Sequence, residues 1–190
     1  MNKIGIFGGT FNPVHKGHLY AAKQFKEQCG LDLVYVIPNN MPHMEKDVSA
    51  SAEDRLQMLN LCFQNEEGFL VSDMEIRRGG VSYTCDTIQT LTEQYGNIDI
   101  YLYCGEDQLE KLPRWKHVEW ICERVIFAFS ARGEQSIDEK VNAFRERFRA
   151  RTTILRFSPL PISSTEIRKG QYNLCPHEVE EYLSSRRIYQ

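Results

Sequence analysis

Two histidines follow a glycine pair near the start of the chain, and this spacing could build a site for an anion. The pair is Gly8 and Gly9, and the histidines are His15 and His18, with Thr10 directly after the glycines. Paired glycines let the backbone turn tightly and approach a ligand closely. Residues three apart, such as the two histidines, share one side of a helical turn.

The elements around this stretch would place it at the start of a helix. The apolar run from Ile4 to Phe7 predicts a buried parallel strand, and a helix is expected to start near Lys16 or Gly17. The free N–H groups and the dipole at a helix N terminus attract anions. A glycine turn before a helix is by itself only weak evidence for a nucleotide site. A histidine pair at this spacing is often exposed without a function, or is half of a metal site.

A second group of polar residues lies close to the other end of the chain, after two prolines. Ser163, Ser164 and Thr165 are three consecutive hydroxyl residues, with Arg168 one helical turn on. Ser163 and Glu166 form a capping-box pattern, which accounts for those two residues without any ligand. Three hydroxyls together with an arginine suit a polyphosphate.

A third group is predicted at the carboxyl end of a strand over 98–104. Gly105 and Asp107 follow this strand, where open α/β sheets bind ligands and where a carboxylate can accept hydrogen bonds from ribose hydroxyls.

Three further candidates lie before helices. Tyr83 and Thr84 precede a helix expected from Thr87 to Tyr95, and simple capping by Ser82 or Thr84 is the alternative explanation. Trp115 has polar neighbours, so a partly exposed ring is expected.

Apolar strand patterns alternate with amphipathic helix patterns along the whole chain. This alternation predicts an α/β fold, a Rossmann-like parallel sheet with helices on both faces. The length of 190 residues suits a single domain over residues 1–190.

The composition limits which binding partners and which cellular compartment are expected. The net charge of -3 offers no basic excess for nucleic acid or an acidic membrane, and no apolar run is long enough to span a bilayer. Six cysteines in a chain without a signal-like start are expected to be buried reduced thiols. A cytoplasmic location is therefore predicted. A homo-oligomer is compatible with the sequence.

Four motifs carry a resemblance that covers nearly the whole chain. The stretch from Gly8 to His18 resembles the histidine-x-glycine-histidine signature of the nucleotidylyltransferase superfamily, and Ile162 to Arg168 resembles its second shared motif. Val81 to Thr87, and Gly105 to Asp107 with Leu112 to Trp115, look like the bacterial nicotinate-nucleotide adenylyltransferases. The resemblance implies transfer of AMP from ATP to nicotinate mononucleotide in NAD (pyridine nucleotide) biosynthesis, with Mg²⁺ arriving on ATP and no metal site built by the protein.

The resemblance also implies a role for each candidate residue. His15, His18 and Arg168 would be catalytic and hold the ATP phosphates. The other implied ATP-binding residues are Gly8, Gly9, Thr10, Gly105, Asp107, Ser163, Ser164 and Thr165. Tyr83, Thr84 and Trp115 would hold the nicotinate group.

Two alternatives and one departure stay open. The acceptor could be nicotinamide mononucleotide or another phosphorylated compound, or the chain could be a nucleotide-binding regulator without activity. The family commonly has Pro-Pro-His-Lys in the loop after the second strand, whereas this chain has Met41, Pro42, His43 and Met44. Lys46 could replace the missing lysine only if the loop shifts.

Overall fold

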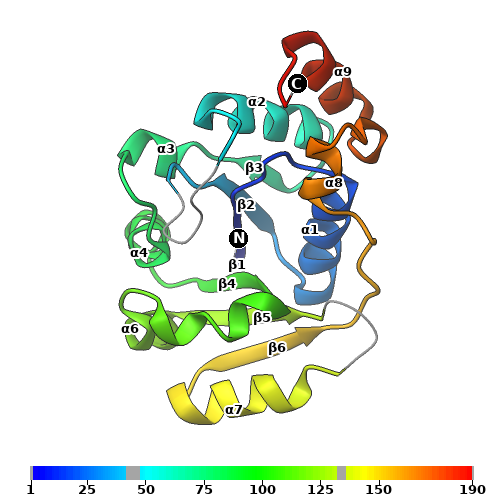
Figure 1. Ribbon diagram of the computed structural model, residues 1–190. Helices are drawn as coiled ribbons and strands as arrows, with labels where there is room; N and C mark the ends of the chain where they lie inside the picture. Colours follow the sequence, from blue (N-terminus) through cyan, green and yellow to red (C-terminus); the bar gives the residue numbers. More distant parts are fainter. Residues whose placement is uncertain (1, 42–47, 132–135, 190) are drawn as a thin grey trace. The chain divides into compact units, whose positions relative to one another are not determined.

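The computed structural model describes residues 2–41, 48–131 and 136–189. Six strands form one sheet in the order β3-β2-β1-β4-β5-β6, and the pairs β1–β4, β4–β5 and β5–β6 are parallel (Figure 1). The strands are β1 (Lys3–Gly9), β2 (Leu33–Pro38), β3 (Phe69–Val71), β4 (Asp99–Gly105), β5 (Val125–Ser130) and β6 (Arg151–Leu155). The α/β class with a parallel sheet is confirmed.

Helices connect the strands, as the alternating pattern predicted. The principal helices are α1 (Lys16–Cys29), α2 (Ala52–Phe63), α4 (Thr84–Tyr95), α6 (Val118–Arg124), α7 (Asp138–Phe148) and α9 (His177–Arg186). The short ones are α3 (Met74–Arg78), α5 (Glu106–Leu109), η1 (Leu112–Arg114), α8 (Ser164–Arg168) and η2 (Tyr172–Leu174). No helix in the described part of the chain is long and apolar enough to cross a membrane.

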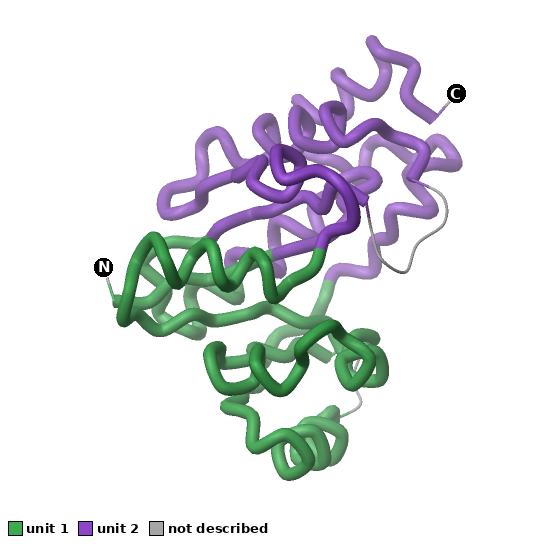
Figure 2. The backbone as a smooth tube through the Cα atoms, turned by 90° about the vertical axis from the view of Figure 1, so that its left-hand side faces the viewer, with its two compact units in different colours: residues 1–7, 24–34, 83–159 green, residues 8–23, 35–82, 160–190 purple. Residues whose placement is uncertain are grey.

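Contacts between Cα atoms divide the chain into two compact units, coloured in Figure 2. Unit 1 contains residues 1–7, 24–34 and 83–159, and unit 2 contains residues 8–23, 35–82 and 160–190. Each unit therefore assembles segments that lie far apart in the sequence.

The core of unit 1 is built on β4 and β5. Ile100, Leu102, Phe127 and Phe129 are buried, and Phe144 of α7 packs edge-on against Phe127, with ring centroids 5.2 Å apart. These strands read as continuous apolar runs because a parallel strand is covered on both faces.

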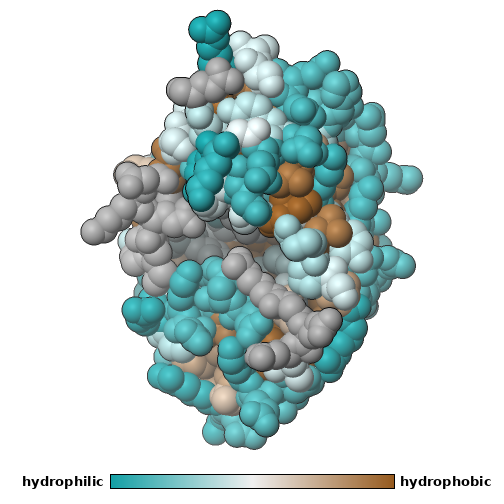
Figure 3. Space-filling view, turned by 45° about the vertical axis from the view of Figure 1, so that its right-hand side comes forward, coloured by the Kyte–Doolittle hydropathy of each residue, from teal (hydrophilic) through white to brown (hydrophobic). Residues whose placement is uncertain are grey.

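The core of unit 2 joins α2 to the C-terminal helix α9. Met58 and Leu59 of α2 and Val179 and Leu183 of α9 are fully buried. Figure 3 shows that hydrophilic residues predominate on the face of the molecule drawn there.

All six cysteines are buried and free, as predicted. Burial raises the pKa of the Cys62 and Cys175 thiols to about 12, because a thiolate would lose its hydration. Such thiols serve as small apolar residues and are poor nucleophiles.

Candidate functional site

The turn between β1 and α1 carries the predicted histidine pair, and both histidines lie at the helix start as expected. Pro13 follows a cis peptide bond, and α1 begins at Lys16. The rings of His15 and His18 stack, with their centroids 3.7 Å apart. The ring of Phe11 meets His18 edge-on at 5.2 Å.

Hydrogen bonds from the backbone fix which nitrogen of each imidazole can carry the proton. The Nδ1 of His15 accepts the backbone N–H of His18 at 3.3 Å, and the Nδ1 of His18 accepts that of His15 at 3.2 Å. A nitrogen that accepts cannot carry a proton, so each neutral ring carries its proton on Nε2. Both rings can therefore donate from Nε2 to a ligand.

Burial keeps His15 neutral. It lowers the pKa of His15 to about 4, and the nearby carboxylate of Glu166 opposes this shift only in part. Gly17 makes the close packing of this ring possible, because a Cβ there would lie 3.0 Å from the His15 Nδ1.

The helix α8, which carries the hydroxyl and arginine motif, lies against the same turn. The hydroxyl of Ser164 donates to the carbonyl oxygen of Pro13 at 2.9 Å, and Arg168 Nη1 donates to that of Asn12 at 2.7 Å. Arg168 Nη2 also donates to the Thr165 hydroxyl at 3.2 Å. The hydroxyls and the guanidinium of this motif thus lie beside the histidine turn within unit 2.

The capping box predicted at Ser163 is confirmed. The Ser163 hydroxyl accepts the backbone N–H of Glu166, and the Glu166 carboxylate accepts the backbone N–H of Ser163. The hydroxyl of Ser163 is therefore engaged in capping α8, whereas Ser164 and Thr165 contact the residues described above.

A buried arginine that was not predicted from the sequence connects two loops at this end of the sheet by hydrogen bonds. Arg55 of α2 is 1% exposed. Its guanidinium donates to the carbonyl oxygens of Thr10 at 2.9 Å, Asn39 at 2.7 Å and Asn40 at 3.0 Å. It thereby ties the loop after β1 to the loop after β2. Neither a motif nor an apolar period marks Arg55, because its acceptors are backbone groups far away in the sequence.

Gly8 and Gly9 end β1 in the same unit. A Cβ at Gly8 would have the carbonyl oxygen of Ile37, 4.0 Å away, as its nearest neighbour, so the surface there is open. A Cβ at Gly9 would lie 3.1 Å from the ring of Phe11. Gly8 is exposed, so its backbone is open to solvent, and the close approach of a nucleotide there stays a prediction.

The remaining candidates lie in unit 1. Gly105 ends β4 and precedes α5, and a Cβ there would lie 2.9 Å from the Asp107 Oδ1. Glycine at this position therefore lets the Asp107 carboxylate sit against the backbone. The carboxylate also accepts a hydrogen bond from Gln108 at 2.9 Å.

Tyr83 and Thr84 stand at the N terminus of α4, but the expected helix boundary was wrong. The helix begins at Thr84, three residues before the predicted start, with Tyr83 as an extended N-cap residue that makes no side-chain capping bond. Capping by Ser82 was also wrong, because its hydroxyl accepts the backbone N–H of Asn40. The Lys116 ammonium lies 4.4 Å from the centroid of the Tyr83 ring and 3.9 Å from the Asp86 Oδ1 in the first turn of α4.

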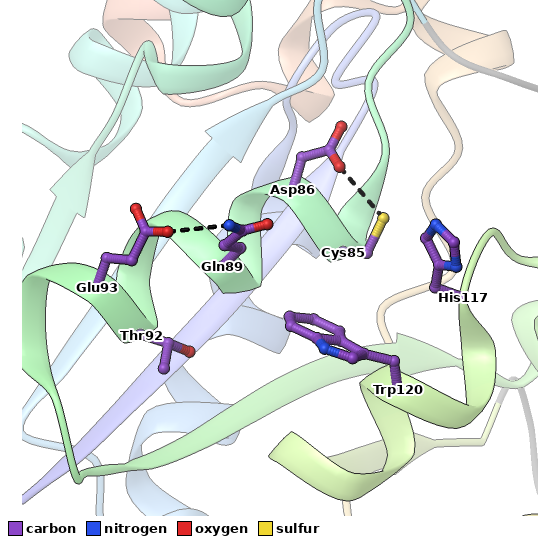
Figure 4. Close-up of a pocket in the computed structure, with 7 residues that line it drawn as sticks. All are labelled: Cys85, Asp86, Gln89, Thr92, Glu93, His117 and Trp120. Carbon is purple, nitrogen blue, oxygen red and sulfur yellow. Dashed lines mark hydrogen bonds between the residues drawn. The ribbon is translucent and has the colours of Figure 1, made fainter.

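Trp115 follows η1 and is half-buried, in line with the expected partly exposed ring. A pocket of about 490 Å³ lies between α4 and α6 (Figure 4). No predicted site residue lines this pocket. Its lining residues are Cys85, Asp86, Gln89, Thr92, Glu93, His117 and Trp120.

The departure from the family pattern falls in the loop after β2. Pro42, His43, Met44 and Lys46 lie outside the described residues, and only Met41 belongs to the described part of that segment.

Comparison with known proteins gives consistent matches. Residues 6–170 match the family model described as cytidylyltransferase-like. A protein of Dictyoglomus turgidum named "Probable nicotinate-nucleotide adenylyltransferase" is 37% identical, over 98% of this chain and 95% of that protein. A protein of the same name from Neisseria meningitidis serogroup A is 34% identical over the full length of both.

Solved structures match the fold. The nicotinic acid mononucleotide adenylyltransferase of Plasmodium falciparum, complexed with NaAD, superposes with a TM-score of 0.81 at 19% identity, over 100% of this chain and 98% of that one. A putative nicotinate-nucleotide adenylyltransferase of Vibrio parahaemolyticus gives a TM-score of 0.66 at 21% identity, over 100% and 96%.

Proposed function

Because the chain belongs to the cytidylyltransferase-like family and, within it, to the nicotinate-nucleotide adenylyltransferases, we propose that it transfers AMP from ATP to nicotinate mononucleotide. The products are nicotinate adenine dinucleotide and pyrophosphate, so the enzyme serves NAD biosynthesis. The observation that carries the assignment of the ATP site is the meeting of Arg168 and Ser164 with the histidine turn.

The reaction needs positioning and charge stabilisation and no nucleophile from the protein. A phosphate oxygen of the mononucleotide attacks the α-phosphorus of ATP, the new P–O bond forms, and the bond to the bridging oxygen of pyrophosphate breaks. Charge develops on the α-phosphate oxygens and on the leaving group. Donors fixed in place before the reaction stabilise this charge without reorganisation.

The residues in unit 2 would supply these donors. The Nε2–H groups of His15 and His18 would bind the phosphate oxygens, with His15 as a neutral donor, and the Arg168 guanidinium would supply a full positive charge. Thr10, Ser164 and Thr165, with Ser163 at the helix cap, would line the phosphates, and Gly8 and Gly9 would allow the nucleotide to approach the backbone.

Mg²⁺ would enter with ATP, held by phosphate oxygens and water. In the residues that the structure describes, no three His, Cys, Asp or Glu side chains are grouped as a metal site. A cation carried by ATP needs no such group, and when bound it would neutralise part of the phosphate charge.

The residues in unit 1 would hold the rest of the substrates. Asp107 would accept hydrogen bonds from a ribose beside Gly105, and Trp115 would stack on the pyridine ring. The backbone N–H groups at the start of α4, by Tyr83 and Thr84, would bind the nicotinate carboxylate. Six buried thiols are typical of a reducing compartment, which supports a cytoplasmic location.

The test is a pyrophosphate-release assay with nicotinate and nicotinamide mononucleotide at saturating ATP. An amide would place an N–H donor against the N–H groups at the start of α4 and would lack the negative charge. We expect kcat/KM to favour the nicotinate substrate by about 10–150-fold, equivalent to ~1.5–3 kcal/mol.

Trp115→Ala is the matched control. Because either pyridine ring can stack on the indole, this substitution should lower kcat/KM by the same factor for both mononucleotides. Equal kcat/KM values for the two mononucleotides in the wild type would contradict a site that selects a carboxylate.

A further inference from the structure

Residues between 164 and 189 contact the histidine turn at several points. Besides Ser164 and Arg168, Cys175 contributes a thiol contact to the carbonyl oxygen of Val14 at 3.4 Å. Tyr189 contributes the shortest contact, a hydroxyl donating to the Asn12 Oδ1 at 2.6 Å. No motif singled out Tyr189, and the proposed chemistry does not use it.

Asn12 receives contacts on both its side chain and its backbone. Its Oδ1 accepts the Tyr189 hydroxyl and also the backbone N–H of Ala50 at 3.2 Å. Its carbonyl oxygen accepts Arg168 Nη1 at 2.7 Å. Asn12 is only 7% exposed, so its side chain has little freedom to turn. The residue that anchors Arg168 is thus itself anchored by Tyr189.

The direction of this hydrogen bond follows from its neighbours. The backbone N–H of Ala50 can only donate, so the Asn12 atom facing it must be the carboxamide oxygen. That oxygen can only accept, so the Tyr189 hydroxyl must be the donor. A tyrosine hydroxyl is protonated at neutral pH, and burial raises the pKa of Tyr189 further above its ordinary value.

We propose that Tyr189 is a positioning residue of the ATP site, which acts through Asn12 on Arg168. The Tyr189 hydroxyl fixes the Asn12 side chain, and the Asn12 carbonyl oxygen fixes the guanidinium beside the Thr165 hydroxyl. The chain's C-terminal segment is thereby part of the phosphate-binding arrangement. This inference rests on the proposed function, because it assigns ATP to the turn.

Tyr189→Phe removes the hydroxyl and keeps the ring. We expect kcat/KM for ATP to fall by about 10-fold, the upper end for one hydrogen bond. Calorimetry should show weaker ATP binding, by about 3-fold or more, while KM for nicotinate mononucleotide stays unchanged. A variant that is merely less stable lowers the active fraction and leaves both the ATP affinity and KM as they were. Weaker ATP binding with an unchanged KM for nicotinate mononucleotide therefore distinguishes a positioning role of Tyr189 from a purely stabilising one.

Tyr182→Phe is the matched control. Tyr182 belongs to the same C-terminal segment, and its hydroxyl donates to Asp54 Oδ1 at 2.8 Å, at the start of α2. The substitution removes one tyrosine hydroxyl without touching Asn12 or Arg168. We expect wild-type ATP affinity and kcat/KM from this variant.

A double-mutant cycle tests the route through Arg168. If Tyr189 acts by placing this guanidinium, then Tyr189→Phe should have little further effect, within about 2-fold, once Arg168→Ala has removed it. If the loss in the double variant equals the product of the losses in the two single variants, Tyr189 does not act through Arg168. Wild-type ATP affinity in Tyr189→Phe would also overturn the proposal. A wild-type protein that binds ATP but does not turn over nicotinate mononucleotide would overturn the proposed function alone, since the affinity comparison would still decide the role of Tyr189.

Discussion

Acid should destabilise this protein well above the pH at which carboxylates titrate, and His15 should be the cause. His15 is 6% exposed, and burial lowers its pKa from 6.5 to about 4. Protonation would also place a proton on Nδ1, which already accepts the backbone N–H of His18. The folded protein therefore resists a proton that the unfolded chain takes up readily.

The pKa difference gives the sign and the size of the effect. Between pH 6.5 and pH 4 the unfolded chain binds more protons at this residue than the folded chain, so stability falls as the pH falls through this window. The full stability is present above pH 6.5. Each pKa unit corresponds to about 1.4 kcal/mol, so the total loss approaches about 3 kcal/mol, of which about 2 kcal/mol is lost between pH 7 and pH 4.5.

Urea unfolding at pH 7 and pH 4.5, with linear extrapolation to water, measures this loss. His15→Asn is the control, because the asparagine Oδ1 can take the place of the imidazole Nδ1 as acceptor but does not titrate. The wild type should lose about 2 kcal/mol more than the variant over this interval. Equal losses in the two proteins would show that the burial of His15 does not control its protonation.

The same property bears on activity. A neutral His15 donates from Nε2 at every pH from 6 to 8, so its titration should leave no step in kcat/KM over that range. A step near pH 6.5 that disappears in His15→Asn would contradict the neutral-donor role.

Two further substitutions test the site and its support. His18→Ala should lower kcat by roughly 100-fold or more in a folded protein, because it removes one donor to the transition state; near wild-type turnover would refute the role of His18. Arg55→Met should lower the free energy of unfolding by about 3 kcal/mol, near 1 kcal/mol for each of the three carbonyl oxygens that lose a donor, as measured by urea unfolding. A change below about 1 kcal/mol would mean that water replaces the guanidinium.

Local patterns in the sequence predicted most of the elements that carry the site. The apolar run at Ile4 to Phe7 lies within β1, and the capping pattern at Ser163 and Glu166 starts α8 as expected. These signals work because each is decided within a few residues. The start of α4 was misplaced because Thr84 and Cys85 have no strong helix preference, and only the structure shows that Tyr83 is the last extended residue.

The supports of the site could not be predicted in the same way. Arg55 resembles an ordinary surface arginine in the first turns of an amphipathic helix, and Tyr189 lies in a polar tail. Their roles depend on backbone and side-chain oxygens that are 15 to 177 residues away in sequence. A backbone carbonyl acceptor cannot be recognised in the sequence, because every residue type has a carbonyl oxygen.

The choice of acceptors for Arg168 follows from what the site must attract. Its guanidinium donates to the carbonyl oxygen of Asn12 and to the hydroxyl of Thr165. A carboxylate partner would hold a guanidinium as firmly but would cancel its charge at the distance of a ligand. Neutral acceptors fix the group and leave its field in place. In a chain with a net charge of -3, local fields of this kind are what allow a polyanion such as ATP to bind.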